Sequence, residues 1–151
     1  MLTSDIKSYI SKSVLCWLAT ASLDHIPNVS PKEVFTYWGD EHLLIANIAS
    51  PGSIRNIREN RNVCVSFIEI FVQKGFQLKG LANIIEKDHP EFQLLFPPLF
   101  KIAGEDFPIA SIIKIEISSI KEIIAPRYLL FPETTEADQI DDAKNTYGLN
   151  N

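Results

Sequence analysis

Residues 28–56 read NVSPKEVFTYWGDEHLLIANIASPGSIRN, which is two strand-like segments followed by the start of a helix. Successive side chains of a strand point to opposite faces, so Asn28, Ser30 and Lys32 share one face and Val29 lies on the other. These three hydrogen-bonding residues form what we call the polar wall. The alternative is an ordinary strand face in contact with solvent.

The helix that follows the apolar run 43–47 has a start that suits an anionic ligand. Ser50 is a favourable N-cap residue and Pro51 suits the first helical position. Backbone N–H groups at a helix start have no acceptor within the helix and often bind phosphate. Arg55 and Arg58 follow within the first turns and add positive charge. This pattern predicts a phosphorylated, partly apolar ligand, although such caps also occur where nothing binds.

Length and charge limit the classes of function. The chain has 151 residues, 46% of them hydrophobic, which is enough for one domain with a core. Of the net charge of −5, residues 132–151 carry −4 and the rest −1. We therefore expect a domain over residues 1–131 and an acidic, flexible C-terminal tail over residues 132–151. A nearly neutral body lacks the basic surface that nucleic-acid binding needs, so no nucleic-acid partner is expected.

Localisation and metal binding are predicted from what the sequence lacks. It has no apolar run of membrane-spanning length and no secretory signal pattern at its start, so we expect a cytoplasmic protein without a membrane partner. Cys16 and Cys64 show no metal-ligand spacing and are expected to be buried, reduced thiols. His25, His42 and His89 are isolated in the sequence. We therefore assign no metal site, no catalytic triad and no catalytic residue.

The hydrophobic pattern predicts six strands and three short helices. Glycine at position 80 indicates a bulge or a close backbone approach, and Pro97 and Pro98 are expected to end the third helix. The apolar segment 92–102 either caps the barrel or meets a second subunit. Hairpin-length connections favour an antiparallel sheet closed into a barrel. The strands are expected at residues 14–21, 26–38, 42–48, 63–68, 76–86 and 113–125, and the helices at residues 4–11, 51–60 and 88–96.

The order of these segments resembles the pyridoxamine 5'-phosphate oxidase-like family of FMN-binding split barrels. The resemblance extends over residues 14–124. It implies a mainly β (α+β) fold, a six-stranded antiparallel split β-barrel with short flanking helices, and a homodimer with FMN in a groove at the interface. The segments that carry the resemblance are Leu18-Ala19-Thr20, Asn28-Val29-Ser30-Pro31-Lys32, Leu44-Ile45-Ala46-Asn47, Arg55-Asn56-Ile57, Asn62-Val63-Cys64-Val65-Ser66-Phe67 and Lys79-Gly80-Leu81-Ala82.

The resemblance also implies the residues that hold the cofactor. The flavin ring and ribityl chain are expected along Asn28, Val29, Ser30, Pro31 and Lys32 and along Ala46, Asn47 and Ile48. The phosphate is expected at Ser50, Gly52, Ser53 and Arg55. Many members have a lysine or arginine where this chain has Gly52 or Ser53, so the phosphate charge is expected to be met by Arg55, Arg58 or the partner subunit. Lys32 or backbone N–H groups are expected at the N1/C2 edge of the flavin.

The expected function is that of an FMN-binding flavoprotein, an FMN-dependent oxidoreductase of the pyridoxamine 5'-phosphate oxidase-like type. In such a protein the cofactor carries the redox chemistry and the chain supplies binding and electrostatics. The partners expected are a small-molecule substrate or NAD(P)H, and the sequence does not assign the substrate. The alternatives are a non-catalytic flavin carrier and a barrel that has lost FMN and acts as a dimeric interaction protein.

Overall fold

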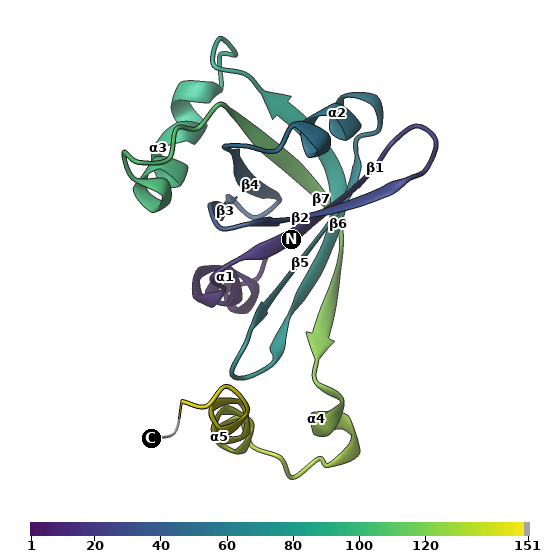
Figure 1. Ribbon diagram of the computed structural model, residues 1–151, viewed down its shortest axis with the longest axis vertical. Helices are drawn as coiled ribbons and strands as arrows, with labels where there is room; N and C mark the ends of the chain where they lie inside the picture. Colours follow the sequence, from purple (N-terminus) through teal and green to yellow (C-terminus); the bar gives the residue numbers. More distant parts are fainter. Residues whose placement is uncertain (150–151) are drawn as a thin grey trace.

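A seven-stranded antiparallel sheet, curled into a split barrel, forms the body of the protein (Figure 1). The computed structural model describes residues 1–149. The strand order across the sheet is β2-β1-β5-β6-β7-β4-β3, so β2 and β3 are the two edges. The fold class expected from the sequence is confirmed. The strands are β1 (Cys16–Ala21), β2 (Pro27–Lys32), β3 (Phe35–Trp38), β4 (His42–Asn47), β5 (Asn62–Glu69), β6 (Lys74–Ile85) and β7 (Ser111–Ile124).

The predicted count of six strands is wrong because the segment 26–38 forms two strands. The chain bends at Glu33 and Val34 and passes from one edge of the sheet to the other, so that β2 pairs with β1 and β3 pairs with β4. Val34 is buried at this bend, and its carbonyl oxygen accepts a hydrogen bond of 2.9 Å from the N–H of Ala46. The bend therefore buries an apolar side chain while one of its backbone groups remains paired.

Strand β4 is buried on both faces and separates two apolar clusters. Leu43 and Ile45 belong to the cluster inside the barrel, whereas Leu44 and Ala46 belong to a second cluster on the other side of the sheet. This explains why the segment is continuously apolar instead of alternating. The buried strand expected in this part of the sequence is confirmed.

Five helices surround the sheet: α1 (Ser4–Lys12), α2 (Pro51–Glu59), α3 (Phe92–Ala103), α4 (Pro126–Leu130) and α5 (Glu136–Thr146). The first two pack on the barrel interior, α1 through Ile6 and Ile10 and α2 through Ile54 and Ile57. Both begin where the sequence predicts. Within residues 1–149, no helix combines the length and the apolar character needed to cross a membrane.

Helix α3 is longer than predicted because Pro97 and Pro98 lie inside it instead of ending it. Its buried residues include Leu95 and Leu99, which lie one turn apart and pack in the second apolar cluster. The burial of this face outweighs the loss of two helical N–H donors. One face of α3 therefore covers the side of the sheet that faces away from the barrel interior, while Leu94 on another face of the helix stays exposed.

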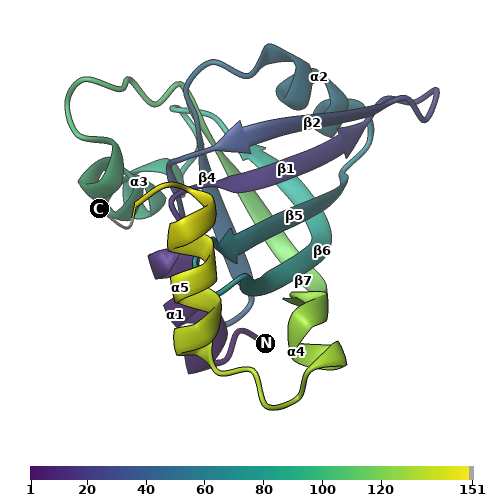
Figure 2. The same cartoon turned by 60° about the horizontal axis from the view of Figure 1, so that its bottom comes forward.

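The C-terminal region, where we expect an acidic, flexible tail, contains the helix α5. A reciprocal capping box between Thr135 and Asp138 satisfies backbone groups at the start of this helix. Lys74 of the β5–β6 hairpin forms an ion pair of 2.8 Å with Glu136. Figure 2 shows α5 at the end of the barrel that also carries α1. The division of the chain at residue 131 stays a prediction, and residues 150 and 151 lie outside the described residues.

Candidate functional site

The polar wall of β2 faces inward and the apolar side chains of the same strand face outward. Asn28 and Ser30 are half-buried and Lys32 is only 7% exposed, whereas Val29 is 57% exposed. In the register with β1, Lys32 lies opposite the buried Cys16. This is the reverse of an ordinary edge strand, in which the polar face meets solvent. The inward direction of the wall points to a ligand site.

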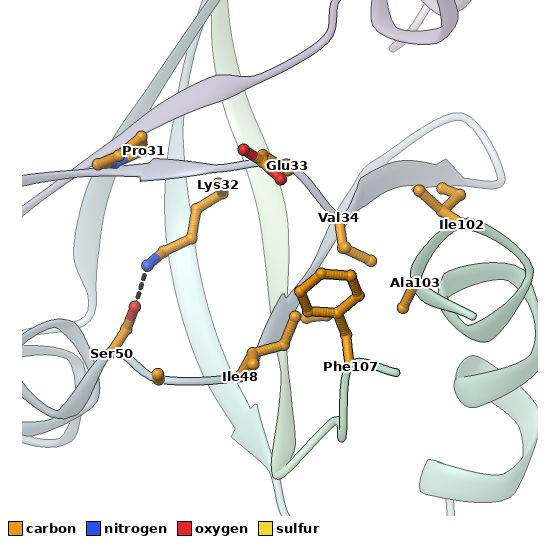
Figure 3. Close-up of a pocket in the computed structure, with 11 residues that line it drawn as sticks. Pro31, Lys32, Glu33, Val34, Ile48, Ser50, Ile102, Ala103 and Phe107 are labelled. Carbon is orange, nitrogen blue, oxygen red and sulfur yellow. Dashed lines mark hydrogen bonds between the residues drawn. The ribbon is translucent and has the colours of Figure 1, made fainter. Parts of the chain in front are cut away.

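The Lys32 ammonium connects the polar wall to the start of α2. Its Nζ donates hydrogen bonds to the hydroxyl of Ser30, at 2.7 Å, and to the hydroxyl of Ser50, as Figure 3 shows for the second bond. Among the salt bridges of residues 1–149, none involves Lys32. Burial lowers the pKa of Lys32 from its ordinary value. A buried cation without a carboxylate partner favours an anionic ligand.

The first turn of α2 is open and its amides are free to bind. The side chain of Ser50 makes no capping hydrogen bond to the helix, and its hydroxyl accepts from Lys32. Asn47 holds the loop: its Oδ1 accepts from the Ser50 N–H at 3.3 Å and its Nδ2 donates to the Ser111 hydroxyl at 2.9 Å. A methyl group built at Gly52 meets no atom within 4 Å. The start of α2 therefore has N–H groups that lack acceptors within the helix, and no side chain caps them.

The two arginines that we expected to supply positive charge are exposed, whereas Lys32 is buried. Arg55 is exposed on α2, and Arg58 forms an ion pair of 2.8 Å with Glu86 on the surface. Arg58 is thus engaged away from the helix start. Lys32, which we expected at the N1/C2 edge of the flavin, is the basic side chain that the structure brings to Ser50, at the helix start where the phosphate is expected.

A cavity of about 340 Å³ adjoins Lys32 and Ser50 (Figure 3). Its polar end is formed by these two residues, and its remaining walls are mostly apolar. Sequence reasoning missed the part of the wall that α3 and the loop after it contribute, although the apolar density of residues 92–102 was its signal. The residues lining the cavity are Pro31, Lys32, Glu33, Val34, Ala46, Ile48, Ala49, Ser50, Ile102, Ala103 and Phe107.

The outer face of the β1–β2 hairpin is apolar and exposed. Trp17 lies opposite Pro31 in the strand pairing, and Ala19 lies opposite Val29. Trp17 is 48% exposed. These side chains lie on the face opposite the polar wall, so the same two strands line the candidate site on one side and an apolar surface on the other.

Both cysteines are free thiols, and Cys16 is buried, as expected, whereas Cys64 is only partly buried. Cys16 has no exposed surface, and burial raises the pKa of its thiol to about 12. Cys64 is partly buried, and burial raises its pKa as well. Among the described residues, no group of histidine, cysteine and acidic side chains is arranged to hold a metal ion.

We expect Cys16 to make the protein less stable in alkali. A thiol whose pKa is raised on folding keeps its proton in the native state after the unfolded chain has lost its own, so stability falls as pH rises from about 9 toward 12. The loss between pH 9 and pH 10.5 should be about 2 kcal/mol. Urea unfolding of the wild type and of Cys16→Ala measures it. The variant should show a smaller loss over this range, and equal slopes would contradict the prediction.

The chain belongs to the pyridoxamine 5'-phosphate oxidase family, because the model of that family matches residues 2–130. No curated protein matches the sequence. The family resemblance seen in the sequence is thereby confirmed.

Solved structures of low sequence identity share the fold. HupZ of Group A Streptococcus is 21% identical and superimposes with a TM-score of 0.68, covering 80% of this chain and 92% of that chain. An FMN-binding protein of Syntrophomonas wolfei is 14% identical with a TM-score of 0.68, covering 80% of this chain and 84% of that chain. The heme storage protein HutZ of Vibrio cholerae is 19% identical with a TM-score of 0.63, covering 82% of this chain and 95% of that chain.

Proposed function

We propose that the protein binds FMN beside Lys32 and the start of α2 and acts as an FMN-dependent oxidoreductase. The observation that carries the proposal is the Lys32 ammonium, which is buried without a carboxylate partner and aimed at an open helix start. A phosphate there would accept hydrogen bonds from the ammonium and from the first amides of α2. Family membership and the FMN-binding relative from Syntrophomonas wolfei support the same ligand.

The donor set fits both ends of FMN. Lys32 and the Ser50 hydroxyl line the cavity and offer hydrogen-bond donors for the phosphate, and the amides of Gly52 and Ser53 follow in the first turn of α2. The cavity walls formed by Val34, Ile48, Ile102 and Phe107 offer apolar surface for the ring system. When bound, the flavin would supply hydride or electron transfer. The chain's part is to bind, to orient and to exclude water, and no side-chain acid or base is assigned.

We also propose that two copies of the chain pair, with FMN at their interface. The apolar outer face of β1–β2, including Trp17 and Val29, supports pairing, because monomeric proteins seldom leave such a continuous face to solvent. The cavity adjoins the edge of the same sheet at Pro31, so a second copy on this face would lie close to the ligand.

Haem is less well supported as a ligand, although HutZ is a heme storage protein. Haem iron is held in proteins by histidine, cysteine, methionine or tyrosine. Within the described part of the chain, the lining of the cavity at Lys32 includes none of these residues.

Two alternatives to an oxidoreductase are a non-catalytic flavin carrier and a barrel that has lost FMN. They differ from an oxidoreductase in their response to FMN and to reductant.

The proposal is tested by the absorption spectrum and the mass of the purified protein. We expect a flavin spectrum, or its restoration on adding FMN, anaerobic bleaching by NADH or NADPH, and a mass about twice the 17.0 kDa of one chain. Flavin absorbance without bleaching favours a carrier. A haem Soret band, or a chain that stays monomeric and ignores FMN, would overturn the proposal.

A further inference from the structure

A small network of buried side chains lies directly behind the start of α2. Thr20 of β1 is 4% exposed, Ser53 is 2% exposed and Asn56 is 8% exposed, and the half-buried Asn28 of β2 completes the group. We call these four residues the Thr20 network. They come from three different elements, yet each has a hydrogen-bond partner within the group.

The hydroxyl oxygen of Thr20 is the centre of the network. It accepts a hydrogen bond of 3.0 Å from the Asn56 amide and one of 3.3 Å from the Asn28 amide. The same Asn28 amide donates to the hydroxyl of Ser53 at 3.4 Å. Thr20 and Asn28 face each other in the β1–β2 pairing, whereas Ser53 and Asn56 lie one turn apart on α2. The network therefore ties the first turn of α2 to both strands.

Burying these four polar residues costs desolvation free energy, and the packing of the barrel does not require them to be polar. Ile54 and Ile57 already fix the inner face of α2 to the core. Apolar residues in place of the network would pack α2 against the sheet without desolvating amides and hydroxyls. What the network adds is a defined orientation of α2. Hydrogen bonds fix the rotation of a helix about its axis, and its position along that axis, more narrowly than apolar contacts do.

We propose that the Thr20 network positions the first amides of α2 for the phosphate of the ligand, so that Thr20 and Asn56 are positioning residues and do not touch the ligand. This inference rests on the proposed FMN site. Ser53 links the two functions, because its hydroxyl belongs to the network while its backbone N–H lies in the first turn of α2. A shift of Ser53 would move that amide relative to Lys32 and weaken phosphate binding specifically.

The test compares FMN with riboflavin, which is the same molecule without the phosphate, by titrating the ligand-free protein and following flavin fluorescence. In Thr20→Val, which keeps the shape and removes the hydroxyl, the Kd for FMN should rise about tenfold and that for riboflavin should change less than about twofold. Thr20→Ser, which keeps the hydroxyl and removes a methyl group, should bind FMN like the wild type. Asn56→Leu provides a second break in the network, with the same selective loss expected.

Two other results would overturn the inference and can be told apart. If the wild type prefers FMN over riboflavin and Thr20→Val keeps that preference, the network serves the fold alone. If the wild type shows no such preference, the phosphate site itself is wrong, and the positioning role falls with it. Urea unfolding of each variant confirms that the protein titrated is folded.

Discussion

Replacing Lys32 with methionine should weaken FMN binding about 100-fold, because the phosphate loses a charge-assisted hydrogen bond in a buried site. Methionine keeps an unbranched chain and leaves the cavity wall formed by Val34 and Ile48 intact. The same change should stabilise the ligand-free protein by about 1 kcal/mol, because it removes a buried ammonium that no carboxylate compensates. Opposite effects on binding and on stability are what separate a ligand-binding lysine from a structural one.

The measurements are the Kd for FMN from fluorescence titration and the free energy of unfolding from urea denaturation. Lys121→Met is the matched control, since it makes the same change at an exposed position on β7. We expect the control to leave both quantities within experimental error. An unchanged Kd in Lys32→Met would place the phosphate elsewhere, with Arg55 as the next basic residue to examine.

Gly80→Ala should destabilise the protein by about 3 kcal/mol or more. A methyl group at this position would lie 2.1 Å from the carbonyl oxygen of Glu116, which is backbone and cannot turn away as a side chain can. The pairing of β6 with β7 changes register between Lys79 and Gly80, so the strands come unusually close at an irregular point. Accommodating the methyl group would require the two central strands of the sheet to separate.

Gly52→Ala is the control for this measurement, because the added methyl group meets no atom within 4 Å and the position is helical. It should stabilise the protein by about 0.5 kcal/mol through the higher helix propensity of alanine. Urea denaturation of both variants gives the comparison. A Gly80→Ala variant as stable as the wild type would show that β6 and β7 can move apart at the bulge.

The parts of the fold that depend on local pattern were predictable from the sequence. The alternation of apolar and polar residues predicted the strands β5 and β6, which form a hairpin. The isolated glycine at position 80 indicated the bulge in β6. The start of α2 followed from Ser50 and Pro51. Each of these features is fixed by residues a few positions apart, which is the range over which propensity and turn chemistry act.

The missed features depend on contacts between residues far apart in the sequence. The strand expected at residues 26–38 is broken because Val34 has a buried place in a cluster formed with α3, which no local signal at this position reveals. Pro97 and Pro98 were expected to end α3, but the buried Leu95 and Leu99 hold the helix together across them. In both cases tertiary packing outweighs local preference.

The candidate site was predictable in its residues but not in its contacts. The period of two placed Asn28, Ser30 and Lys32 on one face, and the structure confirms that they share it. That Lys32 reaches Ser50 depends on the way the sheet curls, which follows from the pairing of all seven strands. Phe107 belongs to the cavity for the same reason, because α3 and the loop after it fold back over the end of β4.

Pro27 and Pro31 should protect the chain against growth into fibrils. An exposed edge strand is a template on which strands from other molecules can add through backbone hydrogen bonds. Strand β2 has two residues that lack an N–H among its six, and the opposite edge, β3, has only four residues. Neither border of the sheet offers a continuous ladder to a foreign strand. Other molecules are therefore expected to contact this protein through the faces of its sheet. Sheets from many molecules should not join edge to edge into a continuous fibril.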